Sequence, residues 1–134
     1  MKKDIDIPEV KDVHVAAVKE MIEGQETWNV FIVNNKPEMI DAVMVTSKGY
    51  LENKIGQETK TSVMRHMIGG VPAKTAAKIE PITPEVFHMN NEYWVTFFFE
   101  NKLYEKKYIF GSHVITPELE EDVPVMNRKG VVVW

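Results

Sequence analysis

Aromatic and β-branched side chains are most densely grouped between residues 93 and 110, on both sides of a short polar segment. The runs YWVTFFF (93–99) and LYEKKYIF (103–110) flank the polar residues ENK (100–102). Side chains of this kind favour strands because they pack well on a pleated, half-buried surface. A short polar break between two such runs is typical of a hairpin. We therefore predict two antiparallel strands in this region.

The register of this hairpin decides which side chains reach the core. If Asn101 and Lys102 form a two-residue loop, one face carries the pairs Phe99–Tyr104, Phe97–Lys106, Val95–Tyr108 and Tyr93–Phe110. We predict that this largely aromatic face is the core face. The opposite face pairs Trp94 with Ile109, and we expect it to be mixed and partly exposed. A slip of one residue would exchange the two faces.

Shorter apolar runs predict the remaining strands. We expect strands over residues 13–18, 28–33, 39–46 and 76–82, with turns at 22–26, 34–37 and 47–49, where Gly, Asn and Pro interrupt the pattern. Residues 50–52 continue the third strand after a bulge. The tail from Val131 to Trp134 is apolar, and we expect it to dock as a strand or to lie in an interface between copies.

Residues 61–68 fit two patterns. Val63, Met64, Met67 and Ile68 fall at helical spacing, with Thr61 or Ser62 as the cap and Gly69–Gly70 as the stop. In a strand, Ser62, Met64, His66 and Ile68 would share a face instead. We predict a short helix. Residues 83–87 and 116–121 each begin with Thr-Pro, which predicts a single helical turn, or one to two turns in the second case.

Together these elements predict an α+β or mostly β fold. We expect one antiparallel, meander-like sheet of six or seven strands with one or two short helices. A length of 134 residues predicts a single domain over residues 1–134.

Composition narrows the classes of function. The chain has no cysteine, which excludes disulfides, thiolate metal sites and a cysteine nucleophile. The first six residues lack the apolar core of a secretory signal, and no apolar run reaches the ~20 residues of a membrane span. We therefore expect a cytoplasmic protein without a membrane partner.

The charge balance argues against nucleic acid as a partner. The net charge is −4, and the only arginines are Arg65 and Arg128, whereas nucleic-acid binders usually carry a basic patch rich in arginine. Lys102, Lys106 and Lys107 alternate with tyrosines around the hairpin, a pattern that can support single-strand stacking. We interpret these lysines as the solvent face of the hairpin.

Candidate chemistry is sparse along the chain. The four histidines have no metal-ligand spacing, so we expect no metal, no cofactor and no catalytic residue. The densest polar group is Ser62, Arg65 and His66, which we take as a candidate ligand-binding site. The Arg65 guanidinium suits an anion, and free amides at a helix N-terminus capped by Ser62 would assist it. The alternative interpretation is a capped amphipathic helix with an arginine on its surface and no bound ligand, which accounts for the same residues.

Three segments resemble a family of small, uncharacterised bacterial proteins of about this length. They are IDIPEV (5–10), ETKTSVMRH (58–66) and NNEYWVTFFFENKLYEKKYIF (90–110). Some members of that family carry the label phenylalanyl-tRNA synthetase subunit alpha, which implies a link to aminoacylation. A class II synthetase core is longer than this chain and needs arginine motifs that Arg65 and Arg128 do not form. The resemblance therefore assigns no catalytic residue to this sequence.

These observations leave three hypotheses for the function. The first is a small non-catalytic binding or protein-interaction domain that forms a homo-oligomer through an exposed edge strand or through the Val131–Trp134 tail. The alternative is a small-ligand enzyme or sensor with a pocket near Arg65 and His66. The third is an accessory protein of the phenylalanyl-tRNA synthetase system.

Overall fold

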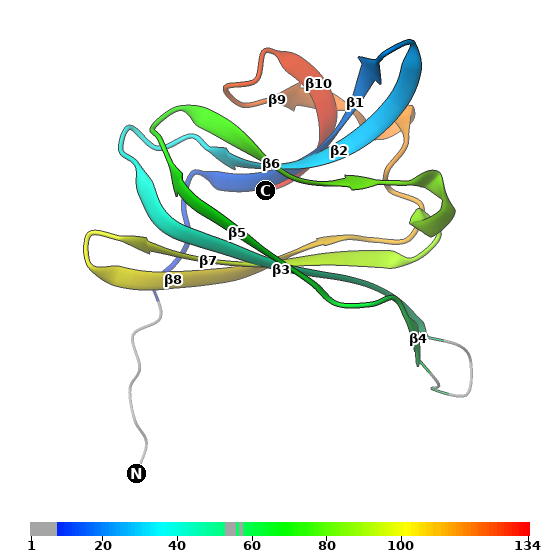
Figure 1. Cartoon of the computed structure of the whole chain (residues 1–134), viewed down its shortest axis with the longest axis horizontal. Helices are drawn as coiled ribbons and strands as arrows, with labels where there is room; N and C mark the ends of the chain where they lie inside the picture. The colour runs from blue at the N-terminus through cyan, green and yellow to red at the C-terminus, as the bar shows by residue number, and fades with distance from the viewer. Residues whose placement is uncertain (1–7, 53–55, 57) are drawn as a thin grey trace.

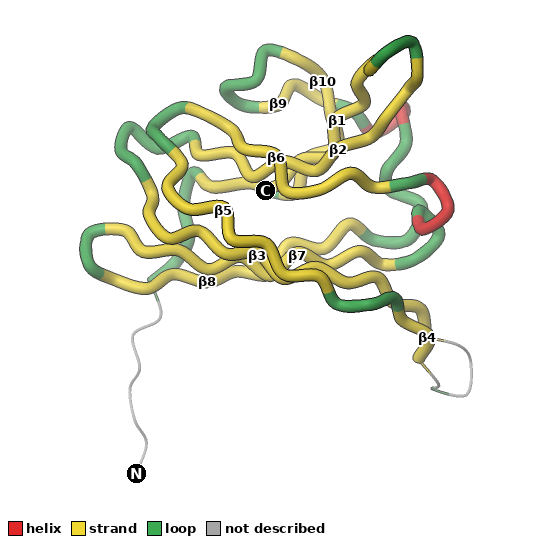
Figure 2. Tube along the Cα trace, viewed as in Figure 1, coloured by secondary structure: helices red, strands yellow, loops and turns green. Residues whose placement is uncertain are grey.

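Strands make up most of the protein. A computed structural model describes residues 8–52, 56 and 58–134, and Figures 1 and 2 show its path. Its strands are β1 (Val13–Ile22), β2 (Gln25–Asn34), β3 (Ile40–Glu52), β4 (Glu58–Lys60), β5 (Met64–Val71), β6 (Thr75–Ile82), β7 (Asn90–Phe99), β8 (Lys102–Phe110), β9 (Glu121–Val123) and β10 (Arg128–Val133). The absence of a secretory signal was predicted from the first six residues, which lie outside the described ranges. The first half of the IDIPEV segment also lies outside them.

The strands form two antiparallel sheets that face each other (Figure 1). The first sheet has the order β6-β2-β1-β10-β9. The second has the order β4-β3-β7-β8, and β5 also pairs with β3. The antiparallel, mostly β class is confirmed, but the predicted single sheet of six or seven strands is wrong. Each sheet carries an apolar inner face, and two such faces are removed from water by packing against each other.

The inner faces share one core. It contains valines and isoleucines of the first sheet together with Tyr93, Phe97, Tyr108 and Phe110 of the second, and each of these four aromatic residues is at most 1% exposed. Buried aromatic rings of this size contribute much of the apolar area that stabilises a small domain. The hydroxyl of Tyr108 donates to the carbonyl of Val13 at 2.6 Å and so ties the two sheets together inside the core.

The β7–β8 hairpin has the predicted core face but another register. Glu100 and Asn101 form its loop with φ of 52° and 62°, as a type I′ turn requires. Phe97 therefore pairs with Tyr104, and Tyr93 with Tyr108. The predicted pairs are wrong by two residues. The face is nevertheless correct, because side chains alternate with a period of two and a shift of two preserves it.

Residues 64–71 form strand β5, so the predicted helix is wrong. The pairing with β3 runs from Met64 opposite Ser47 to Val71 opposite Ile40. A short helix is only marginally stable in water, whereas β5 satisfies its main chain along the free edge of β3. The expected helix stop at Gly69 is instead a left-handed residue, φ 85°, where the register shifts.

Helical structure is limited to two 3₁₀ turns within the described residues. They are η1 (Pro84–Val86) and η2 (Pro117–Leu119), each with the predicted Thr-Pro start. A single 3₁₀ turn forms at each predicted position, but the predicted one or two short helices are wrong for the described residues. No helix in residues 8–52, 56 or 58–134 is long and apolar enough to cross a bilayer.

The apolar tail docks as a strand, which is one of the two predicted outcomes. Strand β10 lies between β1 and β9 in the first sheet, and Val131 and Val132 are buried there within a single chain. Trp134 stays half-exposed and stacks edge-on against the ring of His14 at 4.8 Å. Most of the tail is therefore already covered by its own chain.

A second apolar cluster covers the outer face of the first sheet. It joins side chains of β1, β2 and β10 to Val123 of β9, and Met126 packs against it. In Figure 1 the β9–β10 hairpin lies at the top of the view, away from the second sheet. The outer face of the second sheet, by contrast, leaves large apolar side chains exposed.

Candidate functional site

A carboxylate of the first sheet is turned toward the second. In edge strand β6, Glu80 pairs with Val30 whereas Lys78 pairs with the next residue, Phe31, so Ile79 has no partner in the ladder. A bulge of this kind re-aims side chains. Glu80 then shares the inward face with Val30 and reaches across to the second sheet.

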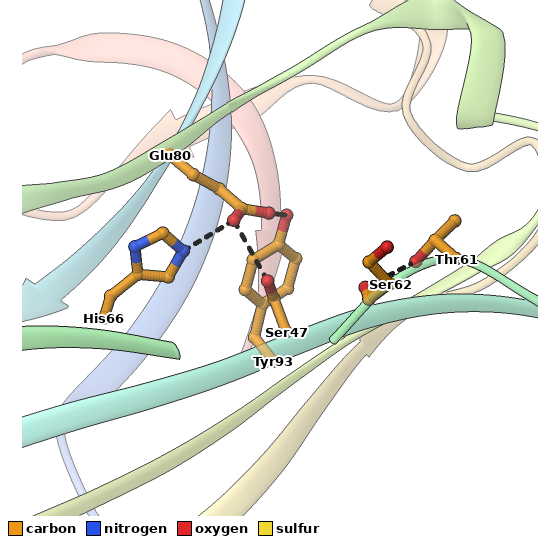
Figure 3. A network of polar contacts seen from close by, with 6 residues as sticks. All are labelled: Ser47, Thr61, Ser62, His66, Glu80 and Tyr93. Atoms are coloured by element: carbon orange, nitrogen blue, oxygen red, sulfur yellow. Dashed lines mark hydrogen bonds and ion pairs between the residues drawn. The ribbon is translucent and has the colours of Figure 1, made fainter. Parts of the chain in front are cut away.

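Three donors from three strands meet this carboxylate (Figure 3). The Tyr93 hydroxyl of β7 donates to Oε2 at 2.9 Å. The Ser47 hydroxyl of β3 donates to Oε1 at 3.0 Å. The Nε2 atom of His66 in β5 lies 2.7 Å from the same Oε1. Glu80 therefore connects β6 to three strands of the opposite sheet.

The network is largely shielded from water. Tyr93 is 1% exposed and Ser47 4%, while the side chains of Glu80 and His66 are 19% and 21% exposed. Burial, reinforced by the neighbouring Glu80 charge, raises the pKa of Tyr93 well above its ordinary value. Tyr93 therefore keeps its proton and remains a donor, and hydrogen bonds to a charged acceptor are the stronger kind.

A cavity of about 340 Å³ opens beside this network. Its size lies at the lower end of the range for small-molecule sites. Glu80, Ser47 and Tyr93 are among its lining residues, and Lys48 together with hydroxyl, amide and apolar groups of neighbouring segments supplies the rest. The further lining residues are Lys48, Gly49, Thr61, Ser62, Met64, Pro81, Ile82, Thr83, Val86 and Asn91.

Local hydrogen bonds hold other lining residues in place. The Thr61 hydroxyl accepts from the Gly49 amide at 2.8 Å and donates to the Ser62 carbonyl at 3.0 Å. The Asn91 side chain donates to the carbonyls of Val86 and Met89. A Cβ atom on Gly49 would lie only 3.0 Å from Asn91 Oδ1 and 3.3 Å from Thr61 Cγ2. Glycine thus lets these segments approach closely at the cavity wall.

The structure separates the three predicted site residues. Ser62 lines the cavity, and His66 reaches it indirectly through Glu80. Arg65 is exposed and pairs with Thr46 on the outer side of the second sheet, because neighbouring strand residues point to opposite faces. The anion site argued from a helix N-terminus loses its basis, since residues 64–71 form a strand and no helix begins at Ser62.

Sequence reasoning missed the central residues of the site. Tyr93 was assigned to the core without a polar role, Ser47 to a turn, and Glu80 to a strand. Glu80 is the sole acid in the run AAKIEPI (76–82), and that acid in an otherwise largely apolar run was the available signal. The approach of β6 to β3, β5 and β7 depends on contacts between distant segments that no local pattern encodes.

The geometry suits binding better than nucleophilic chemistry. Ser47 donates to Glu80 rather than to the imidazole of His66, so the serine–histidine relay that activates a hydroxyl is not formed. Across residues 8–52, 56 and 58–134, no three histidine or acidic side chains gather as metal ligands.

The lysines of the hairpin point in different directions. The Lys106 amine donates to the Trp134 carbonyl at 2.7 Å, toward the first sheet. The Lys107 amine lies 5.0 Å from the Trp94 ring centroid on the outer face. The two lysines therefore do not share a surface that could follow a nucleic-acid backbone.

Comparison with protein families and with curated proteins gives no assignment. No family model matches the chain, and no curated protein matches it significantly. The resemblance to small bacterial proteins and the implied link to a tRNA synthetase stay predictions. The function is therefore argued from the geometry of the site.

Proposed function

We propose that the protein is a non-catalytic binding domain that takes a small polar ligand into the cavity beside Glu80. One observation carries the proposal: the Glu80 carboxylate is held by donors from three strands at the wall of a cavity of about 340 Å³. Binding sites combine an enclosed space with a few polar groups in set positions.

The arrangement at Glu80 favours a ligand that donates hydrogen bonds. A carboxylate accepts roughly four hydrogen bonds, and the protein supplies three of them. A primary amine or hydroxyl group would complete the set. The negative charge of Glu80 disfavours an anion beside its carboxylate. Arg65 lies on the outer face, and the Lys48 amine lies 5.6 Å from the centroid of the Tyr50 ring.

A thermal-shift screen over amines, amino acids, polyols, sugars and nucleosides tests the proposal. A ligand at 100 times its Kd stabilises a protein by about 2.7 kcal/mol, which raises Tm by roughly 5–10 °C for a domain of this size. We expect one class with an amine or hydroxyl donor to give such a shift, and anionic compounds to give none.

Three variants locate the ligand. Ser62→Ala alters an exposed wall residue with little risk to folding, and we expect it to reduce the shift. Glu80→Gln keeps the shape and removes the charge, so the shift should be lost. Glu38→Gln changes an exposed acid in the β2–β3 turn and should leave the shift unchanged. A ligand that stabilises all three variants equally binds elsewhere, and a screen without any shift refutes the proposal.

A further inference from the structure

The outer side of the second sheet carries a group of large apolar side chains that water reaches. Their exposed fractions range from 39% to 80%, and the residues are Met44, Met67, Trp94, Phe98, Leu103 and Ile109. They come from β3, β5, β7 and β8, which lie side by side in the lower layer of Figure 1. We call this surface the open face. Contiguous exposed apolar surface of this kind marks interaction sites.

Charged side chains divide the open face into two halves along the strands. Residues that pair across neighbouring strands form a row. In one half, Asp41 shares a row with Phe98 and Leu103. Glu105 lies in the same half and shares the next row with Thr96 and Met44. The other half holds the bases Arg65, Lys107 and Lys48. Glu92 also lies in the basic half but is only 8% exposed. The accessible charge is therefore acidic at one end and basic at the other.

The geometry points to a homodimer in which the open faces of two copies stack. The twofold axis runs across the strands, between the row of Glu105 and the row of Lys107. Each Glu105 then lies opposite Lys107 of the second copy, and each Asp41 opposite Lys48. Leu103 meets Ile109. Because a twofold contact is reciprocal, every such pair forms twice.

Charge selects this axis over the other face-to-face arrangement. A twofold axis along the strands would leave each row in place and exchange the outer strands. Arg65 would then lie opposite Lys107 of the second copy. Like charges in an interface are strongly unfavourable, so the self-complementary pattern favours the axis across the strands.

The extent of the open face fits a modest but specific interface. Four strands about 4.8 Å apart and four rows about 6.8 Å apart cover about 500 Å² on each copy. The pair then buries about 1,000 Å², which is the lower limit expected of a specific contact. Trp94 near its centre belongs to the residue types that dominate interface energies.

Sedimentation velocity of the full chain over a range of concentrations tests the dimer. We expect a concentration-dependent dimer for the wild type. Met44→Glu buries a charge at the centre of the contact and should weaken the dimer at least about 100-fold. Met21→Glu is the matched control, because Met21 is 69% exposed at the end of the β1–β2 hairpin, and it should leave the dimer unchanged.

Exchange of two charges tests the position of the axis. Lys107→Glu places two acids opposite each other and should weaken the dimer about tenfold or more. The double variant Glu105→Lys, Lys107→Glu restores opposite charges and should return the affinity to within about threefold of the wild type. Circular dichroism of each variant checks that the monomer stays folded.

The outcomes separate this surface from other partners. A wild type that stays monomeric at all concentrations overturns the proposal, whatever else the open face contacts. So does a dimer that tolerates Met44→Glu, because such a dimer would form through another surface. A dimer weakened by Lys107→Glu but not rescued by the double variant overturns the proposed axis. Glu80 and its cavity play no part in these results, so the ligand proposal stands or falls separately.

Discussion

The outer faces of the two sheets differ in what covers them, although both carry large apolar side chains. Phe31 on the outer face of the first sheet is 9% exposed, whereas Phe98 on the open face is 46% exposed. The first face is closed by the β9–β10 hairpin of its own chain, through Val123 and Met126. An outward apolar residue is therefore a core residue on one sheet and a candidate contact residue on the other.

Close approach at Gly130 makes the covered face possible. A Cβ atom there would lie 2.8 Å from the Ala17 carbonyl oxygen, 2.9 Å from Val123 Cγ2 and 3.0 Å from Val18 Cγ2. Glycine lets β10 and β9 curl tightly against β1. The second sheet has no equivalent hairpin within the described residues, so its outer face stays exposed in the single chain.

The largest expected effect separates Phe31 from Phe98. Phe31→Ala opens a cavity in the covered cluster, and we expect it to lower the free energy of unfolding by about 3–5 kcal/mol. Phe98→Ala removes a half-exposed ring and should cost the monomer about 1 kcal/mol or less. Urea unfolding at low protein concentration, where the monomer predominates, measures both. Equal losses would contradict the difference between the faces.

A smaller effect is expected from Gly130→Ala. The added methyl group meets main-chain and side-chain atoms at less than 3.0 Å, so β10 must shift away from β1 at a cost of about 1–3 kcal/mol. Gly111→Ala is the matched control, because its nearest new contact is 3.7 Å.

Amide hydrogen exchange shows where the Gly130→Ala strain acts. We expect faster exchange over residues 121–133 than in the Gly111→Ala control, since local opening exposes those amides. Unchanged exchange in this segment would mean that the hairpin does not depend on the close approach.

The smallest expected effect concerns His14 at the rim of the covered face. Burial lowers the pKa of His14, and nearby Lys106 lowers it further, while its bond to the Trp134 carbonyl and the charge of Asp12 act in the opposite direction. The folded state thus favours the neutral imidazole. This contribution to stability is complete above the unfolded pKa, about 6.5, and is lost as pH falls below it.

Comparison with His14→Gln isolates that contribution. We expect the wild type to lose more stability than the variant between about pH 7 and pH 5, as measured by urea midpoints. An identical loss in both proteins would show that His14 does not titrate differently on folding.

Elements with a strong local pattern were predictable from sequence. Strand preference predicted the aromatic hairpin, and the Thr-Pro pairs predicted the two turns. The apolar character of the Val131–Trp134 tail predicted that it would be removed from water. The core face of the hairpin was correct even though its register was two residues off, because burial depends on the parity of positions. The register of the β7–β8 pairs depends on which two residues form the loop. The observed loop requires a left-handed conformation at Glu100 as well as at Asn101.

The candidate site was only partly predictable. Ser62 and His66 were identified, and the strand alternative placed them on one face. The preferred helix was wrong because Met64 and Ile68 fit one face of a helix and also one face of a strand, so the local spacing does not decide between the two structures. Glu80 was missed, since its importance arises from contacts with residues 13 to 33 positions away.

The order of side chains along the chain was enough to establish that the protein folds as antiparallel strands with an aromatic core, because strand preference and alternation act between near neighbours. The division into two sheets, the Glu80 network and the contrast between covered and open faces required the folded molecule. These features depend on which strand edges and faces meet, and those contacts join residues far apart in sequence that no local preference brings together.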